Sequence, residues 1–129
     1  MEYLADTVAL VRYFSKNGQI GKRAKQILKD TDRGEHIIYI SIISMVEVMY
    51  LTDANRIPLN FGDIKKKILN SDNYRIIDLT MEIVEIARTI EGLELHDRLI
   101  VATGKFLNIP ILTTDHSIEN SGIIEVIWK

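Results

Sequence analysis

The chain has 129 residues, of which 47% are hydrophobic and 26% are charged, so it is long enough to form one domain with a buried core. It contains no cysteine, which excludes disulfides, thiolate zinc sites and thiol nucleophiles. Its net charge of −2 disfavours binding of nucleic acid by phosphate neutralisation alone, but metal ions and local Lys and Arg residues can supply positive charge at a reacting phosphate.

No apolar run approaches the roughly 20 residues that are needed to cross a bilayer. The first six residues lack the basic start and the small-residue cleavage site of a secretory signal, so we expect a cytoplasmic protein. There is no linker, internal repeat or low-complexity tract, and we therefore expect a single domain over residues 1–129.

Short apolar runs alternate with helical patterns along the chain. They predict strands at residues 2–5, 37–40, 75–79, 111–112 and 123–128, and helices at residues 8–14, 20–32, 44–55, 61–69, 80–90 and 97–107. This alternation indicates an α/β fold with three layers, α/β/α, and a mainly parallel central sheet of four to five strands. Ligands of such folds bind outside the carboxyl ends of the strands.

The predicted helix at residues 44–55 is apolar almost all round, so we expect it to be buried on more than one side. Such a surface also suits a dimer or partner interface. Residues 44–47 match the S-x-x-E capping box, in which Ser44 caps the helix and Glu47 is its third residue.

Four acids are expected at the carboxyl edge of the sheet. Asp6 and Asp115 each follow a predicted strand, and Glu47 and Asp97 each fall in the first turn of a predicted helix. Each has a structural alternative: Asp6 and Asp115 as helix caps or turn residues, Glu47 as part of the capping box, and Asp97 as a residue favoured by the helix dipole.

Four acids at one edge of a sheet have a joint explanation as well. Clustered carboxylates repel one another unless a cation neutralises them, and Mg²⁺ prefers such hard oxygen ligands. A divalent ion there can polarise a phosphoryl oxygen and make a bound water nucleophilic. The spacing therefore favours metal-dependent phosphoryl chemistry, with Asp6, Glu47, Asp97 and Asp115 as candidate catalytic and metal-binding residues.

Four short segments resemble, in order, the acidic motifs of PIN-domain nucleases. They are YLADT at residues 3–7, SMVEV at 44–48, HDRLIVAT at 96–103 and ILTTD at 111–115. The match is closest to the VapC-type toxins of toxin–antitoxin pairs, and it covers essentially the whole chain. Any one motif is weak, but the ordered set is fairly specific.

The resemblance implies a PIN domain-like fold and a ribonuclease that hydrolyses RNA phosphodiester bonds with Mg²⁺ or Mn²⁺. Asp6, Glu47, Asp97 and Asp115 would bind one or two ions, with Asp6 and Asp97 as the core ligands, and Thr7 and Thr113 would support these acids. It also implies a homodimer and a cognate antitoxin whose C-terminal segment fills the active-site groove. Many relatives carry a further Asp after the last motif; here the nearest acid is Glu119, which serves either a second metal or only as a solvated helix residue.

Several basic residues have two interpretations. Arg12 and Arg98 either hold RNA phosphates or form ion pairs with the neighbouring acids. The basic runs at residues 22–25 and 65–67 are interpreted as solvated helix faces rather than as a nucleic-acid track. His96, beside Asp97, is a weak candidate for a general base because a metal-bound water would already be available.

Three other classes of protein compete with a nuclease. A phospho-receiver domain needs adjacent acids after its first strand, and only Asp6 is there. A haloacid-dehalogenase-type phosphatase needs a second Asp two positions after Asp6, where this chain has Val8. The stronger alternative is a non-catalytic PIN-like module that binds RNA or a protein, which metal-dependent turnover would distinguish from a nuclease.

Overall fold

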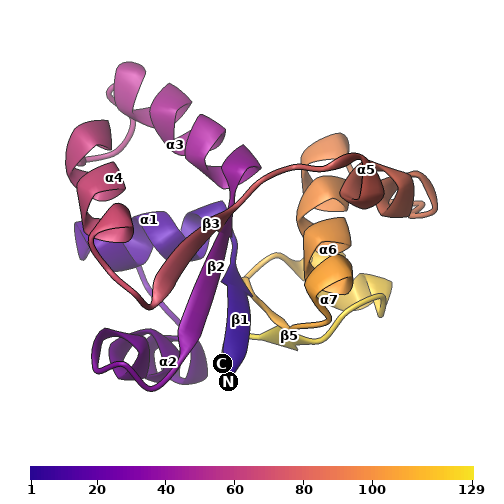
Figure 1. Ribbon diagram of the computed structural model, residues 1–129, viewed down its shortest axis with the longest axis horizontal. Helices are drawn as coiled ribbons and strands as arrows, with labels where there is room; N and C mark the ends of the chain where they lie inside the picture. The colour runs from indigo at the N-terminus through magenta and orange to yellow at the C-terminus, as the bar shows by residue number, and fades with distance from the viewer.

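Five parallel strands form the central sheet of the computed structural model, which describes residues 1–129 (Figure 1). The strands are β1 (Glu2–Ala5), β2 (Ile37–Ser41), β3 (Tyr74–Ile77), β4 (Ile111–Leu112) and β5 (Val126–Ile127). They are arranged in the order β3-β2-β1-β4-β5, and each neighbouring pair is parallel. The predicted α/β class and parallel sheet are confirmed.

The register of the sheet brings the ends of β1 and β4 to the same edge. Ala5 of β1 pairs with Leu112 of β4, and the backbone amide of Asp6 donates to the carbonyl of Leu112 at 3.1 Å. Asp6 and Thr113 therefore follow directly from paired strands, in the middle of the sheet. This is the carboxyl edge at which parallel sheets bind ligands.

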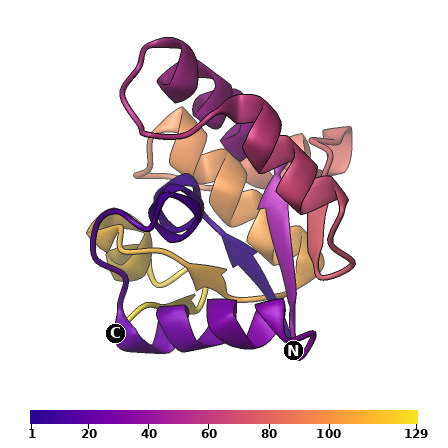
Figure 2. The same cartoon turned by 90° about the vertical axis from the view of Figure 1, so that its left-hand side faces the viewer.

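Seven helices cover the two faces of the sheet (Figure 1). One face carries α1 (Thr7–Ser15), α2 (Lys22–Asp32), α3 (Ile42–Asp53) and α4 (Phe61–Leu69); the other carries α5 (Met81–Arg88), α6 (Leu95–Leu107) and α7 (His116–Ser121). Figure 2 views the molecule from the side of α1 to α4, and α1 is seen end-on between α2 and α4. None of these helices has the length and apolar character of a membrane-spanning segment.

The side chains of β1 divide the core into two parts. Tyr3 and Ala5 pack with α1 to α4, and Leu4 packs with α5 to α7. Successive residues of a strand point to opposite faces, so a central strand with helices on both sides must be apolar at every position. The three-layer arrangement predicted for this chain follows from that pattern.

The start of α3 differs from the prediction. Its N-cap is Ser41, whose Oγ accepts a hydrogen bond from the amide of Ile43 at 3.1 Å. Ser44 is instead the third helical residue, fully buried and without a hydrogen-bond partner for its hydroxyl. The Ser44–Glu47 capping box is therefore wrong, because β2 passes directly into α3 at Ser41 and Glu47 lies in the second helical turn.

The burial of α3 also differs from the prediction. Met45 and Val48 are buried, but Val46, Met49 and Tyr50 are 53%, 44% and 57% exposed. The helix packs on one side only, since α1, α4 and α6 cover part of its circumference and leave this apolar face open. The expectation of burial on more than one side is wrong, and the open apolar face leaves the alternative of an interface.

Other element boundaries shift by a few residues. The helix predicted at residues 80–90 ends at Arg88, and the one predicted to begin at Asp97 begins at Leu95. The strands predicted at residues 75–79 and 123–128 are shorter, Tyr74–Ile77 and Val126–Ile127. Thr80 is the N-cap of α5, since its Oγ1 accepts from the amide of Ile83 at 3.3 Å.

Candidate active site

Asp6 is fixed at the junction of β1 and α1. It is the N-cap of α1, with Oδ1 accepting from the amide of Ala9 at 2.9 Å. Its other oxygen, Oδ2, accepts a hydrogen bond from the Thr113 hydroxyl at the end of β4. The residue is only 9% exposed. The capping interpretation is thus correct, but it leaves a carboxylate buried at the ligand-binding edge of the sheet.

Asp115 is fixed by Thr113 and by the start of α7. Its amide donates to Oγ1 of Thr113 at 3.0 Å, so that one hydroxyl contacts both Asp6 and the backbone of Asp115. Oδ1 of Asp115 caps α7 by accepting from the amides of Ser117 at 2.7 Å and Ile118 at 3.2 Å. Its second oxygen makes no hydrogen bond within the chain.

Glu47 and Asp97 reach the site from two helices that contact one another, α3 and α6. Asp97 lies in the first turn of α6, as predicted from the helix dipole. His96 precedes it, and its Nε2 lies 3.7 Å from Oε1 of Glu47. Both side chains of that pair are about one-third exposed, so they lie at the mouth of the site rather than in the core.

The structure brings the four acids around one cavity of about 230 Å³. The residues lining it are Asp6, Thr7, Val8, Glu47, His96, Asp97, Ile100, Thr114, Asp115 and Ile118. The polar residues come from four segments that are far apart in the sequence, and the apolar ones form its walls. Residues predicted from separate motifs therefore share one concave site, as expected for a ligand-binding edge.

Two acids of this cavity, Asp6 and Asp97, have a raised pKa. Burial is the main cause that raises the pKa of Asp6 from 3.8 to about 6, and the charges of Asp115 and Asp97 add to it. The hydrogen bonds from Thr113 and Ala9 oppose this rise. The pKa of Asp97 is also raised, by burial first and then by the charges of Asp115, Glu94 and Glu47. A bound cation would offset this repulsion between neighbouring carboxylates.

The donor set fits a hard divalent cation by its chemistry. The acids offer carboxylate oxygens, and the Thr7 hydroxyl, which lines the same cavity and is 4% exposed, has no hydrogen-bond partner. A buried hydroxyl without a partner costs free energy, which a bound ion or its waters would offset. In the structure as it stands, no three Asp, Glu or His side chains are arranged closely enough to coordinate one ion.

Three residues considered from the sequence lie outside this cavity. Arg98 donates from Nε and Nη2 to the carbonyl of Ala87, at 3.3 and 3.0 Å, and so ties α6 to the end of α5. Arg12 donates to the carbonyl of Gln19 at 2.8 Å. Glu119 is exposed and lies 3.7 Å from His116. None of the three forms an ion pair with the four acids.

Glu94 was missed by the sequence reasoning. It is the N-cap of α6 but makes no side-chain capping bond, and its charge raises the pKa of Asp97. The sequence predicts a helix that begins at Asp97, so Glu94 falls outside every predicted element. The signal that could have found it is the acid three residues before Asp97, since helices tolerate an acid at or near the N-cap.

The comparisons with known proteins define the class. Residues 3–122 match the model of the PIN domain, and the chain belongs to that family, whose members are generally nucleases. The resemblance to PIN-domain nucleases drawn from the four motifs is confirmed. No curated protein matches the chain.

Solved structures with the same fold narrow the resemblance within the family. The chain is similar to VapBC2 from Rickettsia felis, solved with a promoter DNA fragment, with a TM-score of 0.74, 16% identity and 100% of each chain covered. A toxin–antitoxin complex from Klebsiella pneumoniae has a TM-score of 0.65 and 25% identity, covering 97% of this chain and 95% of that one. FitAcB from Neisseria gonorrhoeae has a TM-score of 0.69 and 16% identity, covering 97% and 96%. The VapC-type resemblance predicted from the sequence is consistent with these neighbours.

Proposed function

We propose that this protein is a Mg²⁺- or Mn²⁺-dependent endoribonuclease, the toxin component of a type II toxin–antitoxin pair. The observation that carries the proposal is the convergence of Asp6, Glu47, Asp97 and Asp115 on one cavity at the carboxyl edge of the sheet. Membership of a family of nucleases supports the reaction class, and neighbours that are toxin–antitoxin complexes support the biological setting.

In this proposal Asp6 and Asp97 are the core ligands of one or two ions, and Glu47 and Asp115 complete the set. When bound, a divalent ion in such a site polarises a phosphoryl oxygen and lowers the pKa of a bound water towards neutrality. The protein's own part is to hold these carboxylates ionised and fixed. Carboxylates that repel one another achieve this only when positive charge is present.

Positioning of the acids depends on the ends of β1 and β4. The Thr113 hydroxyl and the Ala9 amide hold the two oxygens of Asp6 and favour its ionised form, because both bonds lower its pKa. The amides at the start of α7 hold one oxygen of Asp115. His96, beside Glu47, restricts that longer side chain at the mouth of the cavity.

The partners proposed are an RNA substrate, a cognate antitoxin and a second copy of the chain. The antitoxin is supported by neighbours that are toxin–antitoxin complexes. The homodimer is supported by the open apolar face of α3 formed by Val46, Met49 and Tyr50, because exposed apolar surface of this kind marks a contact. We further propose a cytoplasmic location and one domain over residues 1–129.

Cleavage of a mixed pool of single-stranded RNA by the purified protein tests the activity. Cleavage is expected in Mn²⁺ and Mg²⁺, and it should stop in EDTA and in Asp6→Asn. The matched control is Asp72→Asn, an acid on the α4–β3 connection that lies outside the cavity, which should cleave like the wild type. If the wild type binds RNA but never cleaves it with any metal, the alternative of a non-catalytic PIN-like binding module replaces the nuclease.

A further inference from the structure

A second, larger cavity lies at the far end of α1 from Asp6. Its volume is about 710 Å³, about three times that of the acidic cavity. It is lined by residues of α1, α2 and α4 and by the start of β3. The three helices lie on the side of the molecule that faces the viewer in Figure 2. None of the four acids of the candidate active site contributes to it.

This basic cavity is defined by five cations, which carry no compensating ion pairs. They are Arg12, Lys16, Lys25, Lys29 and Lys67. The ion pairs of the structure involve Arg33, Arg88 and the three histidines, and none of these five. Five unpaired cations in one hollow of a protein whose net charge is −2 form a local positive field that attracts anions.

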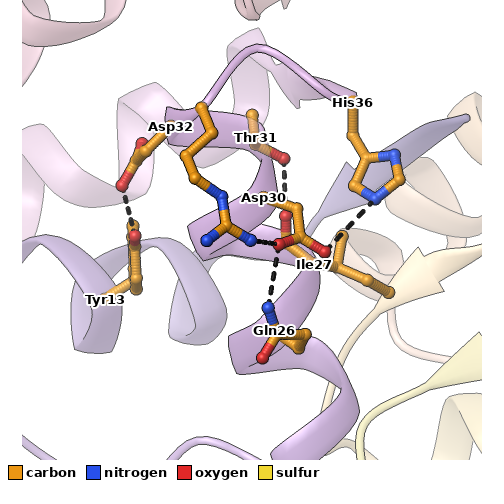
Figure 3. Close-up of polar contacts among 8 residues, drawn as sticks. Tyr13, Gln26, Ile27, Asp30, Thr31, Asp32 and His36 are labelled. Carbon is orange, nitrogen blue, oxygen red and sulfur yellow. Dashed lines mark hydrogen bonds and ion pairs between the residues drawn. The ribbon is translucent and has the colours of Figure 1, made fainter.

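The one acid of the basic cavity is already occupied by tyrosines. Asp32, at the end of α2, accepts hydrogen bonds from the hydroxyls of Tyr13 and Tyr74, the latter at 3.1 Å. Figure 3 shows Tyr13 of α1 directed at Asp32. Asp30 on the same helix is engaged away from the cavity by Gln26 and by His36. The five cations outnumber this single carboxylate, so the cavity keeps a net positive charge.

Aromatic rings lie among these cations. Phe14 and Tyr74 are in tilted contact, with ring centroids 5.5 Å apart, and Nζ of Lys67 lies 5.6 Å from the centroid of Phe14. An adjoining cavity of about 630 Å³ shares Phe14, Lys67 and Ser71 and lengthens the hollow. Tyr74 is only 6% exposed and packs in the core, so the cations and the half-buried ring of Phe14 are the groups that this hollow presents to a single strand.

The basic cavity lies within reach of a strand that occupies the acidic one. Asp6 and Lys16 bracket α1, and ten residues of helix correspond to about 15 Å. On α2, Arg23 lines a small cavity that shares Thr114 and Asp115 with the acidic site, whereas Lys25 and Lys29 line the basic cavity. Helix α2 therefore carries cations that line the basic cavity and a cation beside the acidic site.

We propose that the basic cavity is an RNA-binding exosite, which holds phosphates of the single-stranded substrate outside the bond that is cleaved. This inference rests on the proposed ribonuclease function and extends it to the choice of substrate region. It replaces the interpretation of Lys25 and Lys67 as parts of solvated helix faces. Phosphate contacts of this kind position a strand and strengthen binding without reading its sequence.

Binding of a fluorescein-labelled single-stranded RNA, measured by anisotropy in EDTA with the full chain, tests the exosite without cleavage. Lys25→Gln/Lys29→Gln should weaken binding about tenfold or more, and should reduce the slope of log affinity against log salt by about 1.4, at about 0.7 per lost phosphate contact. The matched control is Lys22→Gln/Lys65→Gln, which makes the same change in net charge on α2 and α4 but outside the basic cavity and the one that adjoins it. Circular dichroism confirms that both variants are folded.

Equal weakening by the two double variants, or no binding by the wild type, would overturn the exosite. A Glu-rich peptide is added as a competitor: if it binds tightly only when Lys25 and Lys29 are intact while RNA affinity is the same in all variants, the cavity takes an acidic polypeptide and the inference is wrong. The two proposals fail separately. Metal-dependent cleavage together with unchanged RNA binding by Lys25→Gln/Lys29→Gln would retain the nuclease and remove the exosite. Weakened RNA binding by this variant, without cleavage by the wild type, would retain the RNA-binding cavity and remove the nuclease.

Discussion

The hydroxyl of Thr113 donates a hydrogen bond to Oδ2 of Asp6 across 107 residues of sequence. The bond joins the end of β1, the central strand of the sheet, to the end of its neighbour β4. Thr113 also accepts from the amide of Asp115, so one side chain fixes two of the four acids. Thr113 follows directly after the short buried strand β4, which places its hydroxyl beside both acids.

Removal of this hydroxyl should damage the site more than the fold. Thr113→Val keeps the shape but leaves Oδ2 of Asp6 and the amide of Asp115 without a partner, and hydrogen bonds to charged groups contribute about 1.5–3 kcal/mol. We expect a loss of stability of that order in urea denaturation, and at least tenfold weaker Mn²⁺ binding by calorimetry. Thr113→Ser, which retains the hydroxyl, should stay close to the wild type. Equal behaviour of the Val and Ser variants would show that the bond has no positioning role.

The pKa of Asp6 predicts an unusual pH dependence for the metal-free protein. Because the pKa is raised from 3.8 in the unfolded chain to about 6 in the folded protein, folding favours the protonated acid. This contribution is fully present below about pH 4 and is lost as the pH rises through 6, which amounts to about 3 kcal/mol. Asp6→Asn is uncharged at every pH and should lack the loss. The free energy of unfolding in EDTA, measured from pH 4 to 8 for both proteins, should therefore diverge in favour of the variant, and parallel curves would contradict the account.

Arg98 is predicted to act on stability and not on RNA. Its guanidinium donates twice to the carbonyl of Ala87, and loss of both bonds in Arg98→Ala should lower the free energy of unfolding by about 1–3 kcal/mol. RNA affinity of the folded variant should be unchanged. The control Arg88→Ala removes an exposed pair with Glu85, which should cost less than about 1 kcal/mol. Weakened RNA binding by Arg98→Ala with unchanged stability would restore the phosphate-binding interpretation.

The open face of α3 is predicted to be the dimer contact. Val46→Lys/Tyr50→Lys places two charges on that face and should convert a dimer into a monomer, as measured by size-exclusion chromatography with light scattering. The control Leu69→Lys changes an equally exposed apolar residue on α4 and should remain dimeric. A wild type that is monomeric at micromolar concentration, or a double variant that stays dimeric, would remove α3 from the interface.

Much of the architecture was predictable because the apolar pattern of each strand is strong. Residues 2–5 and 111–112 end abruptly at polar residues, so Asp6 and Asp115 could be assigned to the carboxyl edge before the structure was known. The start of α3 was not predictable in the same way. Two serines, Ser41 and Ser44, precede the same apolar helix, and only the length of β2 determines which one caps it.

Other features depend on distances that a linear pattern does not contain. Lys25, Lys29 and Lys67 look like solvated faces of two separate helices in the sequence, and they line one cavity only because α2 and α4 lie on the same side of the sheet. Arg98 looks like a partner of the adjacent acid in the sequence, but neighbouring side chains on a helix point about 100° apart, and Arg98 reaches the end of α5 instead.

A crystal structure of the protein soaked with Mn²⁺, with anomalous scattering used to locate the metal, tests the proposed metal site. One or two anomalous peaks are expected within the cavity lined by Asp6, Glu47, Asp97 and Asp115, with carboxylate oxygens as ligands, and the peaks should be lost in Asp6→Asn crystals. Peaks that lie only elsewhere on the protein, or no peak in crystals of a preparation that cleaves RNA in Mn²⁺, would contradict the proposed site.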